Sequence, residues 1–220
     1  MNISVCTIES LTQLRKKASD SKIINTGQEN LRTKVIDFLK IEKNKPELRI
    51  FIEEPSILRR IKGVLVNGKI ANDLPSMVGH TFASVVNNKG EEFFFGLRNI
   101  IAVRGQALKL TEFVSYLCGK KGTAVIYTKP SEFHVCKKIP ITPEDAETLI
   151  NKARETEKTL NANENNKEYQ LLTKNCTTFL IDLTKSIGLN LYPSKNKLVT
   201  PVELTKHFRK TTPKKLFLEV

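Results

Sequence analysis

The sequence has no apolar run long enough to cross a membrane. Its longest apolar cluster lies around residues 93–95, whereas a spanning helix needs roughly 20 such residues. A cleavable signal peptide is also missing, because polar residues interrupt the N-terminal stretch where a basic segment should precede an apolar one. We therefore expect no transmembrane segment and no cleaved leader.

Cysteine is scarce and scattered. The four cysteines, at positions 6, 118, 136 and 176, form no CxxC pair and no tight cluster with the three histidines. That spacing excludes a zinc finger or ribbon and does not suggest a disulfide framework in a chain of 220 residues. We expect reduced thiols, and neither a metal ion nor an organic cofactor.

Basic charge is abundant but not concentrated. Lys and Arg outnumber Asp and Glu by 36 to 23, a net charge of +13, and residues 1–62, 63–140 and 141–220 each carry a basic excess. The sharpest local excess is a C-terminal tail with Lys206, Arg209, Lys210, Lys214 and Lys215. A nucleic-acid-binding protein gathers its basic residues into one stripe, so we expect no dedicated nucleic-acid role. Contact with an anionic membrane, a glycan or an acidic protein fits the composition better.

The first 62 residues differ in composition from the rest. They are rich in Lys, Asn, Ser and Glu and contain a single glycine, Gly27. Leu31, Val35, Phe38 and Leu39 recur at helical spacing, which predicts a helix from about residue 26 or 28 to residue 43. We therefore assign residues 1–62 to a polar, partly helical N-terminal extension. Residues 63–220 form a separate domain in this interpretation.

From Gly63 the pattern changes to short strands and then to helices. The expected strands are 63–70 with a hairpin turn at Asn67–Gly68, 80–86 and 91–96 joined by a turn at 87–90, and a pair formed by 122–128 and 133–139. The expected helices run from Pro143, capped by Thr142, to about residue 159, from 176 to 187 before Gly188, and from Pro201 onwards. This order of elements predicts an α+β fold.

Cys176 stands where a polar loop becomes an apolar helix. A thiol in the first helical turn meets unpaired amides and the positive end of the helix dipole, both of which favour the thiolate. We therefore expect Cys176 to have a lowered pKa and to face a cleft. A nucleophilic cysteine also needs an imidazole to take its proton. Among His80, His134 and His207, we favour His80, which follows Gly79 at the start of a predicted strand.

The segments around these two residues resemble a known superfamily. Residues 79–85 (GHTFASV), the strand pair after them, a helix opened by ITPED and the motif Tyr169-x5-Asn175-Cys176-x2-Phe179 are similar to circularly permuted papain-like cysteine hydrolases of the NlpC type. The resemblance covers about residues 63–190. It implies an antiparallel sheet packed against the cysteine-bearing helix. It also implies Cys176 as the nucleophile, His80 as the general base and then acid, and the Cys176 amide as part of the oxyanion hole.

The resemblance implies a third polar residue that orients the histidine, and the sequence does not place it. A turn centred between Asn88 and Lys89 would put Leu97 opposite His80 and leave Asn99 as the polar candidate, while Glu92 would need a bulge. This gap leaves open a degenerate, non-catalytic domain.

Other residues give weaker signals. His134 and Cys136 alternate onto one strand face, but neighbours on one strand seldom form a dyad, and Cys136 has no helix dipole. Tyr169 is expected to cap an apolar face or to line the cleft. His207 lies in a basic segment, and Cys6 and Cys118 carry no signal beyond packing.

These observations predict a thiol hydrolase of the peptidase or amidase type, acting through a Cys176–His80 dyad and a thioester. We expect a protein, peptide or peptidoglycan-like substrate, and a bacterial effector or toxin that is secreted without a cleaved leader and acts in a target cell. The alternatives are a lipid acyl hydrolase or acyltransferase at anionic membranes, and a non-catalytic binding module with a decayed site.

Overall fold

The computed structural model describes residues 33–42, 44–55, 69–70, 79–99, 108–109, 124–128, 133–163, 169, 174–193 and 199–219. The predicted hairpin turn at Asn67–Gly68 lies outside these residues, as do Cys6 and Cys118.

The described elements are mainly strands, then helices. They are a helical segment at 33–38, β1 (Glu47–Glu53), β2 (Lys69–Ile70), β3 (His80–Val86), β4 (Glu92–Asn99), β5 (Leu108–Lys109), β6 (Ala124–Tyr127), β7 (Val135–Pro140), α7 (Pro143–Asn161), α8 (Cys176–Lys185), α9 (Pro201–Thr211), a 3-10 turn (Lys214–Leu216) and β8 (Phe217–Glu219). Six strands pair in the order β6-β4-β3-β1-β7-β8, while β2 and β5 pair separately. All the pairs are antiparallel, so the fold is α+β.

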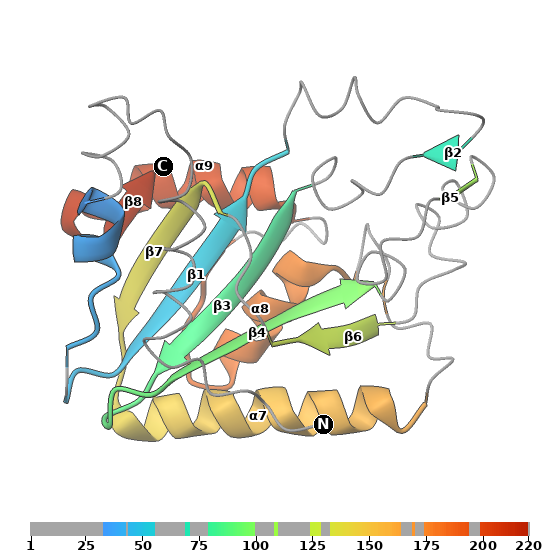
Figure 1. Cartoon of the computed structure of the whole chain (residues 1–220), viewed down its shortest axis with the longest axis horizontal. Helices are drawn as coiled ribbons and strands as arrows, with labels where there is room; N and C mark the ends of the chain where they lie inside the picture. Colours follow the sequence, from blue (N-terminus) through green and yellow to red (C-terminus); the bar gives the residue numbers. More distant parts are fainter. Residues whose placement is uncertain are drawn as a thin grey trace, which may run out of the picture.

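The six-stranded sheet has two differently covered faces. On one face, Leu48, Ile50 and Ile52 of β1 are fully buried in a core shared with α7, α8 and α9, and Figure 1 shows α8 and α9 behind the sheet. On the other face, Phe51 and Phe82 stack in a smaller cluster that Leu39 joins. The alternation of side chains along a strand separates the two sets. We call these faces the helix face and the outer face.

The central position of β1 corrects the predicted domain boundary. β1 pairs with β3 on one side and with β7 on the other. Residues 47–53 are therefore not part of a separate extension, because they supply a strand in the middle of the sheet. The apolar run 48–52 is too short to reveal from its own pattern that its partners come later in the chain.

Two further predictions about the elements are wrong in detail. The helix predicted to reach residue 43 ends at residue 38 within the described part of the chain, and Asn44 has a positive φ of 61°. The strands at 122–128 and 133–139, predicted to pair with each other, are instead far apart in the sheet, since β6 pairs with β4, and β7 pairs with β1 and β8. The predicted pairing of 80–86 with 91–96 is confirmed by β3 and β4.

The turn between β3 and β4 is one residue longer than its sequence suggests. Val86 pairs with Glu92. Between them, the Asn87 side-chain oxygen accepts hydrogen bonds from the amides of Lys89 and Glu91, both at 3.0 Å. Gly90 takes a φ of +79°, which suits glycine. This arrangement shifts the register by one residue, so the predicted pairing of His80 with Leu97 is wrong.

The helix starts agree with their local signals. Thr142 caps α7 in a reciprocal pair with Asp145, and Pro143 occupies the first turn. Thr200 caps α9, with Pro201 in its first turn, and Gly188 follows α8 with a φ of +72°. Short-range hydrogen bonds decide these ends, and short-range sequence therefore predicts them.

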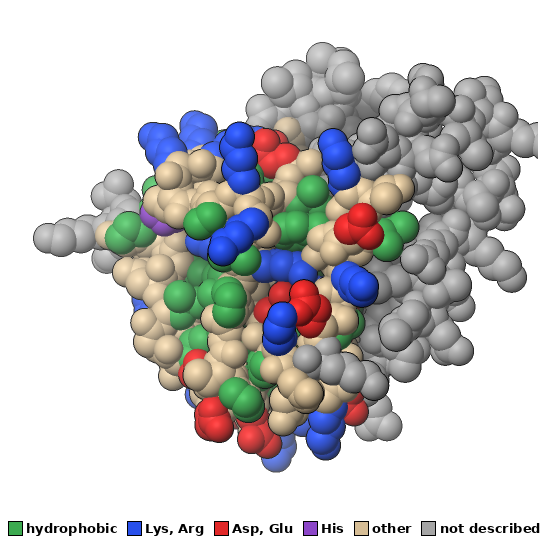
Figure 2. Space-filling model, turned by 90° about the vertical axis from the view of Figure 1, so that its left-hand side faces the viewer, with side chains coloured by type: hydrophobic (Ala, Val, Ile, Leu, Met, Phe, Trp, Pro, Cys, Tyr) green, Lys and Arg blue, Asp and Glu red, His purple; other side chains and the backbone are tan. Residues whose placement is uncertain are grey.

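Charged side chains are mixed on the visible surface. Figure 2 shows Lys and Arg side chains spread over this face, with Asp and Glu between them, in keeping with an excess that forms no single stripe. None of the described helices combines the length and the apolarity that a membrane crossing requires. Within the described residues, no three His, Cys, Asp or Glu side chains group closely enough to hold a metal ion.

Candidate active site

Cys176 is the first residue of α8, and Asn175 fixes the start of that helix. The Asn175 Oδ1 accepts hydrogen bonds from the amides of Thr177, at 2.9 Å, and Thr178, at 3.0 Å. The Asn175 Nδ2 donates to the carbonyl oxygen of Val199 at 3.4 Å. Asn175 thus ties the helix start to the segment before α9. The cap covers the amides of Thr177 and Thr178 and not the amide of Cys176.

The Cys176 thiol is buried where α8 meets β3. The residue is 3% exposed. Burial raises the pKa of Cys176, against the lowering effects of hydrogen bonds from the Thr81 backbone and from Thr177 and of the Arg98 charge. The helix start therefore does not yield the low-pKa thiolate expected from sequence, because loss of hydration outweighs the favourable contacts. The expected cleft-facing side chain is likewise a buried one.

His80 begins β3, and its imidazole is buried on the outer face. The residue is 3% exposed, and its ring stacks on Phe82 with the ring centroids 5.9 Å apart. Arg98 of β4 donates its Nε hydrogen to His80 Nε2 over 3.0 Å. Burial and then the positive charge of Arg98 lower the pKa of His80 well below its ordinary value. The imidazole is therefore neutral near pH 7.

The structure brings Cys176 and His80 to the same end of β3 but to opposite faces of that strand. Thr81, the residue after His80, contacts Thr177 of α8 through its side chain and hydrogen-bonds to the Cys176 sulfur through its backbone. His80 shares the outer face with Phe82. Among the residues that the structure describes, no hydrogen bond joins the thiol to the imidazole. One strand residue thus separates the two groups.

Two charged residues next to His80 in the sheet were not predicted from the sequence. Arg98 is one, and the other is Glu53, which is buried and pairs directly with His80 across the β1–β3 ladder. The alternation of side chains along a strand could have predicted their positions, because residues two apart share a face. Glu53 lies two residues after Phe51, and Arg98 lies two residues after Gly96. The shifted register is what hid Arg98.

The residues proposed as the third member take other positions. Asn99 pairs with Ala124 of β6. Glu92 lies opposite Val86 at the far end of β3. There it accepts a hydrogen bond from the Ser84 hydroxyl at 2.5 Å. It also forms an ion pair with the buried Arg49 at 3.1 Å. Glu92 thus belongs to a buried charge cluster and not to the surroundings of His80.

The rival histidines and cysteine have contacts of their own with residues other than Cys176. Cys136 is fully buried in the outer-face cluster, and burial raises its pKa strongly. The exposed His134 accepts a hydrogen bond at Nδ1 from the Glu54 amide, at 3.0 Å. His207 packs edge-on against Tyr192 with the ring centroids 5.2 Å apart. Tyr169 is buried.

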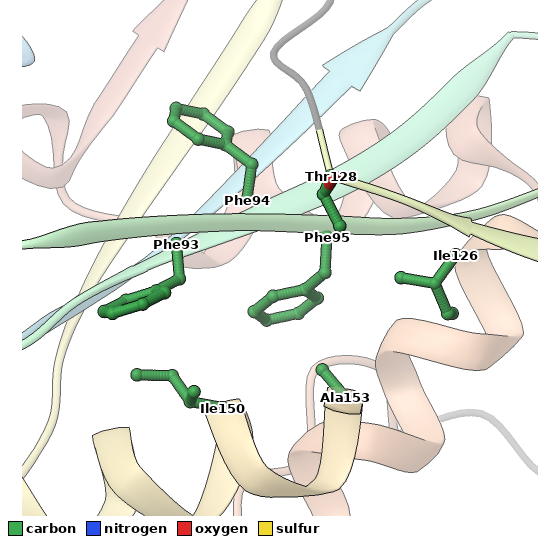
Figure 3. A pocket seen from close by; sticks show the side chains of 7 residues that line it. All are labelled: Phe93, Phe94, Phe95, Ile126, Thr128, Ile150 and Ala153. Atoms are coloured by element: carbon green, nitrogen blue, oxygen red, sulfur yellow. The ribbon is translucent and has the colours of Figure 1, made fainter. Parts of the chain in front are cut away.

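A small apolar pocket lies on the helix face, apart from both candidate residues. It is lined by Phe93, Phe94, Phe95, Ile126, Thr128, Ile150 and Ala153. Figure 3 shows Phe93 and Phe95 pointing toward α7, while Phe94 points to the other side of β4. Neither Cys176 nor His80 lines this pocket, so it does not serve as a substrate channel to them.

No family model matches the chain, and no curated protein matches it in sequence. Among solved structures, the chain is similar to a crystal structure of the type VI secretion system effector TseH, with a TM-score of 0.48 and 14% sequence identity. The superposition covers 77% of this chain and 91% of that chain. A likeness at this level carries no argument about what this chain does.

Proposed function

We propose that the protein is a cysteine hydrolase of the permuted papain-like type, with Cys176 as nucleophile and His80 as general base. The observation that carries the proposal is the position of the Cys176 sulfur. It lies at the start of α8, where the hydroxyl of the next residue, Thr177, lies 3.0 Å from the hydroxyl of Thr81, the residue next to His80. A nucleophile at a helix start near the strand that carries a histidine supplies the two groups that acyl transfer through a thiol uses, once the imidazole reaches the sulfur.

In this mechanism, a ring nitrogen of His80 takes the thiol proton as the sulfur attacks the carbonyl carbon of an amide or ester. The bond to the leaving group breaks as the imidazolium returns that proton to it, which leaves a thioester on Cys176. Water then attacks the thioester carbon and gives a proton to His80. The carbon–sulfur bond breaks, the imidazolium returns the proton to the sulfur, and a carboxylic acid leaves. The Cys176 amide, which the Asn175 cap leaves uncovered, is suited to bind the oxyanion.

The described conformation is the resting state in this proposal. Both side chains are nearly inaccessible, and the imidazole is held by Arg98. Turnover therefore requires a local rearrangement at the ends of β3 and α8 that admits a carbonyl group and brings the imidazole of His80 within reach of the Cys176 sulfur. The protein, peptide or peptidoglycan-like substrate, the secreted-effector role and the anionic-membrane alternative stay predictions that rest on sequence. Co-sedimentation with anionic liposomes tests the last of them.

The test is acylation of the full chain by p-nitrophenyl acetate, an activated ester. We expect acetyl transfer to Cys176, located by peptide mass spectrometry. Cys176→Ala should abolish it, and His80→Gln should slow it by about 10²-fold or more, the usual contribution of a general base. His134→Gln, a change at an exposed histidine, is the matched control and should leave the rate unchanged. Nitrophenol release that is independent of Cys176 would contradict the proposal.

The same burial favours one competing interpretation, a non-catalytic module. In that case Cys176 and His80 are packing residues, with Arg98 satisfying the imidazole permanently. Cys176→Ala and His80→Gln would then lower the free energy of unfolding without changing any acylation rate. Chemical denaturation of the same variants separates the two interpretations.

A further inference from the structure

We propose that Arg98 is a positioning residue that sets the tautomer of His80, placing the ring proton on Nδ1 and keeping the imidazole unable to accept the Cys176 proton until Arg98 withdraws. This inference rests on the proposed function for its consequence, although the tautomer itself can be tested without any activity.

The first step is the chemistry of the hydrogen bond. An arginine guanidinium carries donors only and is not deprotonated in proteins. Arg98 donates to His80 Nε2 at 3.0 Å, so Nε2 must present its lone pair. A neutral imidazole carries one N–H, and the bond made by one nitrogen decides where that proton stands. The proton of His80 is therefore on Nδ1.

The second step is the place from which Arg98 acts. A side chain at position 96 would contact the imidazole, because a Cβ atom there would lie 3.6 Å from His80 Nε2. The same Cβ would lie 2.8 Å from Phe82 Cβ, which is too close. Position 96 is therefore a glycine, which has no side chain that could contact the imidazole. Arg98, two residues further along the same face of β4, supplies the contact to Nε2.

The third step is the consequence for the thiol. A general base needs a free lone pair within reach of the proton that it removes. The Nε2 lone pair of His80 is engaged by Arg98, and Nδ1 already bears a hydrogen. The positive charge of Arg98 also opposes protonation of the ring. In the described conformation His80 thus has no nitrogen available to Cys176, so the site is latent.

The experiment measures the tautomer directly. Full-length protein labelled with 15N-histidine has three imidazoles, and His80→Gln identifies the signals of His80. In the wild-type protein near pH 7, we expect the Nε2 of His80 to show the chemical shift of an unprotonated nitrogen and Nδ1 that of a protonated one. Arg98→Lys retains a donor and should keep this tautomer. Arg98→Gln offers an amide oxygen as acceptor and should move the proton to Nε2.

Thiol alkylation supplies the functional half of the test. With iodoacetamide at neutral pH, we expect Cys176 in Arg98→Gln to react roughly 10-fold faster or more than in wild type and in Arg98→Lys, because a free Nδ1 lone pair can then act as base. The rate for the buried Cys136 in the same samples controls for general loosening of the fold.

The outcomes separate the two proposals. A wild-type His80 with its proton on Nε2 would overturn the role of Arg98, whatever the variants do. Equal alkylation rates of Cys176 in wild type and Arg98→Gln would also overturn it, while the hydrolase proposal stands. If Arg98→Gln changes the tautomer and Cys176 still takes no acyl group from p-nitrophenyl acetate, the role of Arg98 in setting the tautomer is supported and the proposed function fails.

Discussion

Thr81 and Thr177 join β3 to α8 through their hydroxyl oxygens, which lie 3.0 Å apart in a fully buried setting. Each residue follows one of the candidate pair, since Thr81 comes after His80 and Thr177 after Cys176. This contact therefore fixes the distance between the helix start and the strand end on which the proposed chemistry depends.

We expect the two threonines to behave as a coupled pair. Thr81→Val or Thr177→Val alone leaves one buried hydroxyl without its partner and should cost about 1–3 kcal/mol of unfolding free energy. The double variant removes both groups and should cost less than the sum of the singles. Urea denaturation of the four proteins in this cycle measures the coupling. Additive effects would show that the hydroxyls do not depend on each other.

The central position of β1 gives a prediction for residues of the presumed extension. Ile50→Ala removes a fully buried side chain from the core and should lower the free energy of unfolding by about 2–5 kcal/mol. Ile36→Ala, the same change at a side chain that is 43% exposed, should stay within about 0.5 kcal/mol of wild type. Similar losses at both positions in denaturant titrations would argue against a central β1.

The buried ion pair on the outer face should be sensitive to removal of either partner. Arg49 is 1% exposed and contacts Glu92, while its other donors reach Glu47 and the Lys40 carbonyl. Arg49→Met leaves Glu92 buried without this cation and should cost about 3–5 kcal/mol.

The double variant Arg49→Met/Glu92→Leu provides the comparison, and thermal and urea unfolding provide the measurement. The double variant should lose less unfolding free energy than the two single variants together, because neither charge is then left buried without its partner. Removing the exposed pair Lys152–Glu155 through Glu155→Gln should leave the midpoint close to wild type. Strict additivity at Arg49 and Glu92 would count against a direct interaction.

His80 should make the fold sensitive to mild acid. Its pKa in the folded protein is well below the ordinary value, so below about pH 6.5 the unfolded chain binds a proton that the folded chain does not. Stability contributed by the neutral ring is therefore fully present above that pH and falls by at most about 1.4 kcal/mol per pH unit as the pH decreases.

Urea titrations between pH 7 and pH 5 test this dependence. His80→Gln should flatten the slope, and His134→Gln should keep it. An unchanged slope in His80→Gln would assign the acid sensitivity to other groups.

Sequence was sufficient where structure depends on neighbours in the chain. The helix starts at Thr142, Asn175 and Thr200 each combine a capping side chain with the residues it caps. The strands β3, β4, β6 and β7 were also predicted, because glycine, asparagine and alternating apolar residues mark their ends. The α+β class follows from the order of these elements.

Sequence was not sufficient where structure depends on distant segments. The run 48–52 gives no sign that β3 and β7 enclose it, because its partners lie elsewhere in the chain. The position of Cys176 at a helix start was predicted correctly, but the depth of its burial depends on how β3 and α8 pack together. That packing reverses the expected direction of its pKa.

The connection at residues 87–91 selects which chemistry faces His80. Because it holds an odd number of residues between Val86 and Glu92, one alternate set of β4 side chains, which includes Phe94 and Arg98, shares the outer face with the imidazole. A slip of one residue in this pairing would turn β4 over and present the set of Phe93, Phe95 and Leu97 instead. The histidine would then sit among hydrocarbon and have no guanidinium beside it. A change in this loop that shifts the register would thus replace the side chains around His80, without any substitution beside it.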